Sequence, residues 1–266
     1  MGTSKNQEID ILVQFAMEVI HNSGEKALSY YGMGKQDVKF DDGLVTEAEL
    51  SLMDFFQDQL YAQFPDHQVF NSNQKNKGYT HEGKRYLWIY DPLEGVANFQ
   101  AGIPIWGSSL SLLENFWPIL GIFYMPATGD LFYAQAGKKA FLGKKEISIS
   151  AQETINDESL LLTYSRFHQH YNSTFPGKIR DLGCTTAHIC YVAMGRAEAA
   201  IITNESYQDL AAARVIVEAA GGKIAKIDGS EFQLDEYLDG QKIEDHLIVG
   251  APKIYSQIRT YLQETS

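Results

Sequence analysis

The chain has 266 residues, of which 44% are hydrophobic and 21% charged, a balance typical of a folded globular protein. A formal net charge of -12 argues against a nucleic-acid partner, because proteins that bind phosphate backbones carry a basic surface. No apolar run reaches the roughly 18 residues of a membrane span, no signal peptide is visible, and two cysteines are too few for a disulfide framework. We therefore expect a cytoplasmic protein that binds neither nucleic acid nor a membrane.

Two amphipathic helices are predicted near the start of the chain. Between residues 7 and 31 the apolar residues recur at helical spacing; they are Ile11, Phe15, Ala16, Val19 and Ile20. A second helix is predicted to start with a capping box formed by Thr46 and Glu49 and to end at Pro65. Its expected apolar stripe consists of Leu50, Met53, Leu60 and Phe64.

The middle of the chain is predicted to form strands, and the last third alternates strands with helices. The first strand-like runs cover residues 86–90, 108–113, 119–124 and 131–134, and a hairpin follows at "LGKK". After Ser159 the strands "LLLTYS", "AEAAIIT", "KIAKI" and "HLIVGA" alternate with the helices "CTTAHICYVAMG" and "DLAAARVIVEAAGG" and a final helix. This order predicts layered α/β packing, either in one large domain or in two lobes that share a cleft.

The segment "YLWIYDPLEGVANF" ends an apolar strand with two carboxylates, Asp91 and Glu94. Mg²⁺ prefers oxygen ligands, and two carboxylates on either side of a turn with proline can converge on one ion. The carbonyl of Leu93 can reach the same region, and the N–H groups of residues 95–98 can face an anion. Without further support, the same pattern also fits a solvated turn capped by an aspartate.

A second acidic point, Asp209, precedes an apolar helix and would by itself be interpreted as a helix cap. "DPLEGVANF" followed by "QDLAAARVIVEAAGG" resembles the two signatures of the inositol monophosphatase family, D-P-[IL]-D-G-T-x-N-F and W-D-x-A-A-G-x-x-I-V-x-E-A-G-G. Gln208 stands where the second signature has tryptophan. The resemblance extends from about Gly43 to the end of the chain, through "LVTEAE", "FPDH", "GIFYMPATGDLFYAQAGKKAF", "LGCTTAHICYVAMGRAEA" and "HLIVGA".

The resemblance implies a layered α-β-α-β-α sandwich. It implies one phosphatase-like domain over residues 1–266, with an α+β lobe (about 1–150) and an α/β lobe (about 151–266) that share the active-site cleft. The implied activity is that of a Mg²⁺-dependent, lithium-sensitive phosphomonoesterase acting on inositol or sugar phosphates as a homodimer. The implied metal ligands are Asp91, the carbonyl of Leu93, Glu94 and Asp209. The implied phosphate and sugar contacts are Gly95, Val96, Gly183, Cys184 and Thr185.

Several positions depart from the family pattern. Ser72 replaces a glutamate that bridges metals, and Val96 replaces a threonine that orients the attacking water. Glu49 stands where that threonine has an aspartate partner, although its role can be limited to the capping box. Glu94 is one methylene longer than the usual aspartate, and Ile202 replaces a glutamate that binds a substrate hydroxyl. Two hypotheses follow: a weak phosphomonoesterase with one dominant Mg²⁺ site, or a non-catalytic relative that binds a small phosphorylated metabolite.

Two further features each allow two interpretations. Cys184 follows Gly183 at an expected helix start, where a thiol can be reactive, but a small side chain packed beside the cleft is the simpler interpretation. "HQH" at residues 168–170 could bind a transition metal, but we expect a polar loop.

Overall fold

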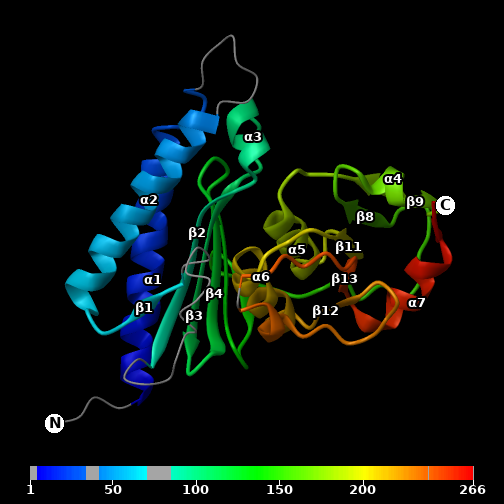
Figure 1. Ribbon diagram of the computed structural model, residues 1–266. Helices are drawn as coiled ribbons and strands as arrows, with labels where there is room; N and C mark the ends of the chain where they lie inside the picture. Colours follow the sequence, from blue (N-terminus) through cyan, green and yellow to red (C-terminus); the bar gives the residue numbers. More distant parts are fainter. Residues whose placement is uncertain (1–4, 34–41, 71–84, 239, 266) are drawn as a thin grey trace.

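Helices and sheets alternate in five layers in the computed structural model, which describes residues 5–33, 42–70, 85–238 and 240–265. Figure 1 shows α1 (Lys5–Leu28) and α2 (Asp42–Gln63) against one face of the first sheet. The opposite face of that sheet packs on α6 (Tyr207–Ala219), which lies beside α5 (Thr185–Ala193). The second sheet follows, and α7 (Pro252–Thr260) packs against it. This is the α-β-α-β-α sandwich that the resemblance to the inositol monophosphatase family implied.

The first sheet contains seven strands among the described residues, in chain order across the sheet. β1 runs parallel to β2, and every later pair is antiparallel. Its strands are β1 (Gln68–Val69), β2 (Tyr86–Glu94), β3 (Gly107–Glu114), β4 (Trp117–Met125), β5 (Asp130–Gln135), β6 (Ala140–Leu142) and β7 (Lys145–Ile147).

The second sheet contains five strands in the described part of the chain, in the order β10-β8-β11-β13-β12. Its strands are β8 (Leu160–Thr163), β10 (Lys178–Arg180), β11 (Ala199–Ile202), β12 (Lys223–Lys226) and β13 (Leu247–Gly250). The smaller elements are α3 (Val96–Ala101), α4 (Phe167–His170), the 3-10 helix η1 (Leu234–Tyr237), and the paired strands β9 (Tyr171–Ser173) and β14 (Leu262–Glu264).

The predicted faces of the two N-terminal helices are only partly correct. Four of the five residues expected to be buried on α1 are buried, but Ile11 is 52% exposed. On α2 the buried residues are Val45, Ala48, Leu52, Phe56 and Leu60. Leu50, which the sequence placed in the stripe, is 61% exposed. The expected capping box is also wrong: α2 begins before Thr46, whose hydroxyl donates to the carbonyl of Asp42 inside the helix.

Other short elements differ from the sequence prediction. The "HQH" segment lies in the one-turn helix α4, not in a loop, and the described residues contain no group of three metal-ligating side chains there.

No described helix is both long enough and apolar enough to cross a membrane.

Candidate active site

The two carboxylates of the first motif are brought together by a bulge in β2. The pairing with β3 passes from Asp91 opposite Ser109 to Glu94 opposite Gly107, so β2 contains one extra residue between them. In a regular strand, residues three apart point to opposite faces of the sheet. The extra residue turns the strand and allows the two carboxylates to approach each other. The hydroxyl of Ser108 donates to the carbonyl of Pro92 at 2.7 Å and fixes the bulge.

Directly after the bulge, Gly95 makes a turn that requires glycine. Its φ is +84°, in the left-handed region, and an added Cβ would lie 3.0 Å from the Cβ of Cys184. The short helix α3 starts at the next residue, Val96. Its first N–H groups have no acceptor within the helix, as at every helix start. The turn predicted over residues 95–98 therefore takes the form of a glycine followed by one turn of helix.

Asp209 reaches the same place from α6. It is the third residue of the helix, and Ser206 is the N-cap: the Ser206 N–H donates to Asp209 Oδ2 at 2.6 Å, and the Asp209 N–H donates to Ser206 Oγ at 3.3 Å. Asp209 is thus part of a capping box, which leaves Oδ1 for another partner. The amide of Gln208 donates to the carbonyl of Tyr90 at 2.7 Å and ties the start of α6 to β2, next to Asp91.

The three acids predicted as metal ligands converge. One carboxylate oxygen each of Asp91, Glu94 and Asp209 lies within 4.8 Å of the others. No described lysine, arginine or histidine forms an ion pair with them. Burial, followed by repulsion from Glu94 and Asp209, raises the pKa of Asp91 well above its usual range. A divalent cation would relieve this repulsion, and a set of oxygen ligands suits Mg²⁺.

Glu94 is held by the start of α5. The N–H of Thr186 donates to Glu94 Oε1 at 3.2 Å, so the positive end of the helix faces the carboxylate. Burial and Asp209 nevertheless raise the pKa of Glu94. Cys184 is the N-cap of α5 and is only 3% exposed. Burial and the neighbouring Glu94 raise the pKa of its thiol, which supports the packed side chain and not the reactive thiol.

The loop in front of α5 is clamped from two sides. The amide of Asn98, on α3, donates to the carbonyls of Ile105 and Leu182, both at 2.6 Å. The N–H of Leu182 donates to Nε2 of His188 at 2.8 Å. Burial lowers the pKa of His188 to about 4, so the ring is neutral and Nε2 is free to accept. Gly183 has a φ of +72°, and an added Cβ would lie 2.7 Å from Asn98 Oδ1. The loop expected to contact the sugar is therefore rigidly attached to α3 and α5.

The positions predicted to activate water are less complete. Val96 is half-buried and packs on the apolar cluster beneath α1 and α2. Glu49, on α2, is half-buried, and burial raises its pKa. Its charge also contributes to the raised pKa of Asp91, so it lies within electrostatic reach of the acids. Ser72 lies outside the described residues.

One acid of this region was not found from the sequence. Glu205 lies in the connection between β11 and α6 and is only 8% exposed. The hydroxyl of Thr185, an expected sugar contact, donates to Glu205 Oε1 at 2.7 Å. Burial, then Glu94 and Asp209, raise the pKa of Glu205 to about 8. No motif marks Glu205, because it lies in the polar segment "TNESYQD" and outside both signatures.

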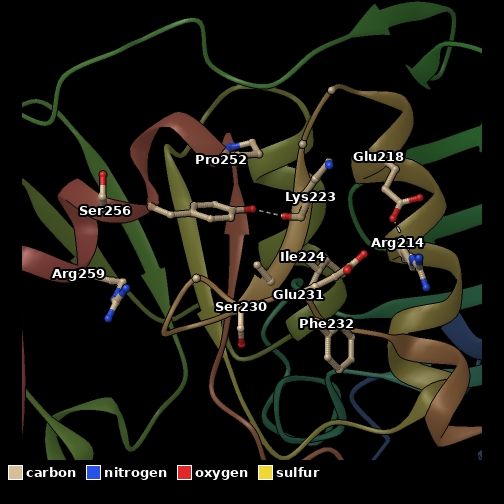
Figure 2. A pocket seen from close by; sticks show the side chains of 15 residues that line it. Arg214, Glu218, Lys223, Ile224, Ser230, Glu231, Phe232, Pro252, Ser256 and Arg259 are labelled. Atoms are coloured by element: carbon tan, nitrogen blue, oxygen red, sulfur yellow. Dashed lines mark hydrogen bonds and ion pairs between the residues drawn. The ribbon is translucent and has the colours of Figure 1, made fainter.

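A cavity of about 940 Å³ lies elsewhere and contains none of these acids. Figure 2 shows it between α6, which contributes Arg214 and Glu218, the start of β12 at Lys223, and α7, which contributes Arg259. Arg214 and Glu218 already pair with each other at 2.8 Å. This cavity is therefore separate from the three converging carboxylates.

The sequence matches one protein family and several phosphatases of known name. The family model described as "Inositol monophosphatase family" matches residues 8–264. The histidinol-phosphatase of Chlorobaculum parvum is 31% identical over 233 residues, which cover 84% of this chain and 88% of that protein. Inositol monophosphatase 3 of Solanum lycopersicum is 30% identical and covers 87% of this chain and 91% of its own length.

The solved structures agree in fold. The inositol monophosphatase (IMPase) of Thermotoga maritima superposes with a TM-score of 0.74 at 23% identity, over 94% of this chain and 95% of the other. An inositol monophosphatase from Anabaena superposes with a TM-score of 0.72 over 96% of each chain. With both signatures on the converging bulge and helix, and with the family model matching nearly the full length, the chain belongs to the inositol monophosphatase family.

Proposed function

We propose that this protein is a Mg²⁺-dependent phosphomonoesterase that hydrolyses an inositol or sugar phosphate, with reduced activity. The observation that supports it most directly is the convergence of Asp91, Glu94 and Asp209 without a compensating cation among the described residues. We further expect the protein to act in the cytoplasm as a homodimer.

The roles of the residues follow from their chemistry. Asp91, Glu94 and Asp209, with the carbonyl of Leu93, would hold the metal ion. Bound Mg²⁺ supplies positive charge for the phosphate and for the oxygen of the leaving group. The backbone N–H groups after Gly95 would donate hydrogen bonds to the phosphate oxygens. The contacts expected for the alcohol part of the substrate are Gly183, Cys184 and Thr185.

Activity should be limited by the positioning of the attacking water. Ser72 offers no charge where the family has a glutamate, and the valine at position 96 offers no hydroxyl. Glu49 is a carboxyl group whose pKa is raised by burial, so it could accept a proton. It cannot orient the attacking water through residue 96, however, because valine has no hydroxyl group. Losing one group that stabilises a transition state typically costs about 10²- to 10³-fold in rate. Two such losses leave binding intact and turnover slow.

The second candidate is a non-catalytic protein that binds a phosphorylated metabolite. The observation that favours it is the same aliphatic side chain, Val96, at the first residue of α3. Both candidates predict binding of Mg²⁺ and phosphate, and only the first predicts turnover.

A phosphate-release assay separates the two candidates. The wild-type chain is assayed with inositol and sugar phosphates, in Mg²⁺ and in EDTA, at high enzyme concentration. We expect slow release in Mg²⁺ that disappears in EDTA and falls by at least about a hundredfold in Asp91→Asn. Normal binding of Mg²⁺ and phosphate without release from any ester would favour the non-catalytic protein.

A further inference from the structure

Glu205 is a buried carboxyl group beside the acid cluster that neither the predicted metal ligands nor an ion pair explains. In the described part of the chain, only one other acidic residue, Asp91, is buried. No described cation pairs with Glu205, and the nearby Lys242 donates to the carbonyl of Asn204 instead, at 3.4 Å. Burying an unpaired carboxyl group is costly, so its presence here requires an explanation.

The position of Glu205 is fixed by its neighbours. Its backbone exchanges two hydrogen bonds with Ile243, at 3.2 and 2.8 Å. Its side chain accepts from Thr185, the first residue of α5. The next residue of that helix, Thr186, donates its N–H to Glu94. Two consecutive residues of α5 therefore contact the two acids: Thr185 donates to Glu205, and Thr186 donates to the predicted metal ligand Glu94.

Ile202, the last residue of β11, lies three residues before Glu205. Ile202 stands where the resemblance expects a glutamate for a substrate hydroxyl, but its side chain is 0% exposed and packs in the apolar core. A carboxyl group is instead present three residues later, at Glu205 in the connection that follows β11. Its Oε1 accepts from Thr185, and no described residue donates to its other oxygen.

We propose that Glu205 determines specificity: with Thr185 it forms the subsite for the alcohol part of the phosphate ester and accepts a hydrogen bond from a hydroxyl or an ammonium group there. This inference rests on the phosphatase function proposed above. A donor on the ligand would satisfy the free oxygen of Glu205, whose other oxygen already accepts from Thr185. An ester whose alcohol is purely alkyl leaves the buried carboxyl unsatisfied and is bound less well.

The test compares three phosphate esters on the full chain. Inositol 1-phosphate offers hydroxyl groups, O-phosphoethanolamine offers an ammonium, and n-butyl phosphate offers no donor. The measured quantity is kcat/KM for each donor ester divided by that for n-butyl phosphate. The variants are Glu205→Ile, Glu205→Ala and Glu205→Gln. The matched control is Glu231→Gln, an exposed glutamate that lines the cavity in Figure 2.

In the wild type we expect the ratio to favour a donor ester. Both truncations should lower that ratio by about tenfold to a hundredfold, mainly through KM, as expected for one lost hydrogen bond to a carboxyl. Glu205→Gln distinguishes the two donors: the ratio for inositol 1-phosphate is kept within about threefold if a hydroxyl is bound, and the ratio for O-phosphoethanolamine is lost if an ammonium is bound. Glu231→Gln should keep the wild-type ratios.

Three results would overturn the proposal. The truncations could lower kcat/KM for all three esters by the same factor, which would indicate a structural role. They could leave the ratios unchanged. Glu205→Gln could weaken Mg²⁺ binding, measured by calorimetry, which would make Glu205 a metal ligand.

If the wild type releases no phosphate from any ester, the phosphatase proposal fails. The ratios are then taken from calorimetric dissociation constants, so Glu205 is still tested.

Discussion

Glu205 should make the metal-free protein less stable as the pH rises. The pKa of this carboxyl is about 8 in the folded protein, against an ordinary value of 4.5. Above pH 4.5 the unfolded chain therefore loses its proton first, and unfolding is favoured until the folded carboxyl also ionises near pH 8. At about 1.4 kcal/mol per pKa unit, the difference between these two values corresponds to about 5 kcal/mol. That is a large part of the roughly 5 to 15 kcal/mol that stabilises an ordinary domain.

The variant Glu205→Gln isolates this contribution. Its amide has nearly the same shape and does not titrate in this range. Urea unfolding is measured in EDTA at pH 5, 7 and 9 for the wild type, Glu205→Gln and the exposed control Glu231→Gln. We expect the free energy of unfolding of Glu205→Gln, relative to the wild type, to rise by about 4 kcal/mol between pH 5 and pH 9. The control should follow the wild type. Parallel curves for Glu205→Gln and the wild type would refute the reasoning.

Two further predictions concern the phosphate turn and the attacking water. Gly95→Ala should destabilise the fold by about 2 to 4 kcal/mol and weaken phosphate binding, because its positive φ and its contact with Cys184 both oppose a methyl group. Gly129→Ala, with a φ of +76° and open space around it, should lower the free energy of unfolding by only about 1 kcal/mol in the same assay. Equal destabilisation by the two variants would show that the contact with Cys184 does not oppose a methyl group at Gly95. The double change Ser72→Glu and Val96→Thr should raise kcat by more than about tenfold and keep phosphate affinity within a few-fold. Unchanged turnover with normal binding would show that the water-activation account is wrong.

Much of the fold could be predicted because its signals are local. The strand that ends at Asp91 is a continuous apolar run, and the later helices and strands of the second sheet follow their own periodicity. The start of α2 was misjudged because a Thr-x-x-Glu pattern also fits inside a helix: Thr46 bonds back to Asp42. The stripe that included Leu50 failed for a related reason, since the face of α2 that is buried depends on the sheet that covers it.

The candidate site, like the fold, could be predicted from the sequence only in part. Asp91, Glu94 and Asp209 could be predicted because two signatures in the right order mark them. The bulge that aims the first two carboxylates and the capping box that orients the third could not, since both depend on pairing with other segments. Glu205 could not be predicted at all. Its burial and its bond to Thr185 arise only when β11 and α5 pack together.

The central claim is that Asp91, Glu94 and Asp209 form one metal site, and calorimetric titration with Mg²⁺ tests it most directly. Asp209→Asn removes the charge but keeps an oxygen for the Ser206 N–H, and the exposed Asp235→Asn is the matched control. We predict one dominant Mg²⁺ site in the wild type and in the control, with affinity at least about tenfold weaker in Asp209→Asn because a hard cation depends on charged oxygen ligands. No binding in the wild type, equal affinity in Asp209→Asn, or two or three tightly bound ions would contradict the account.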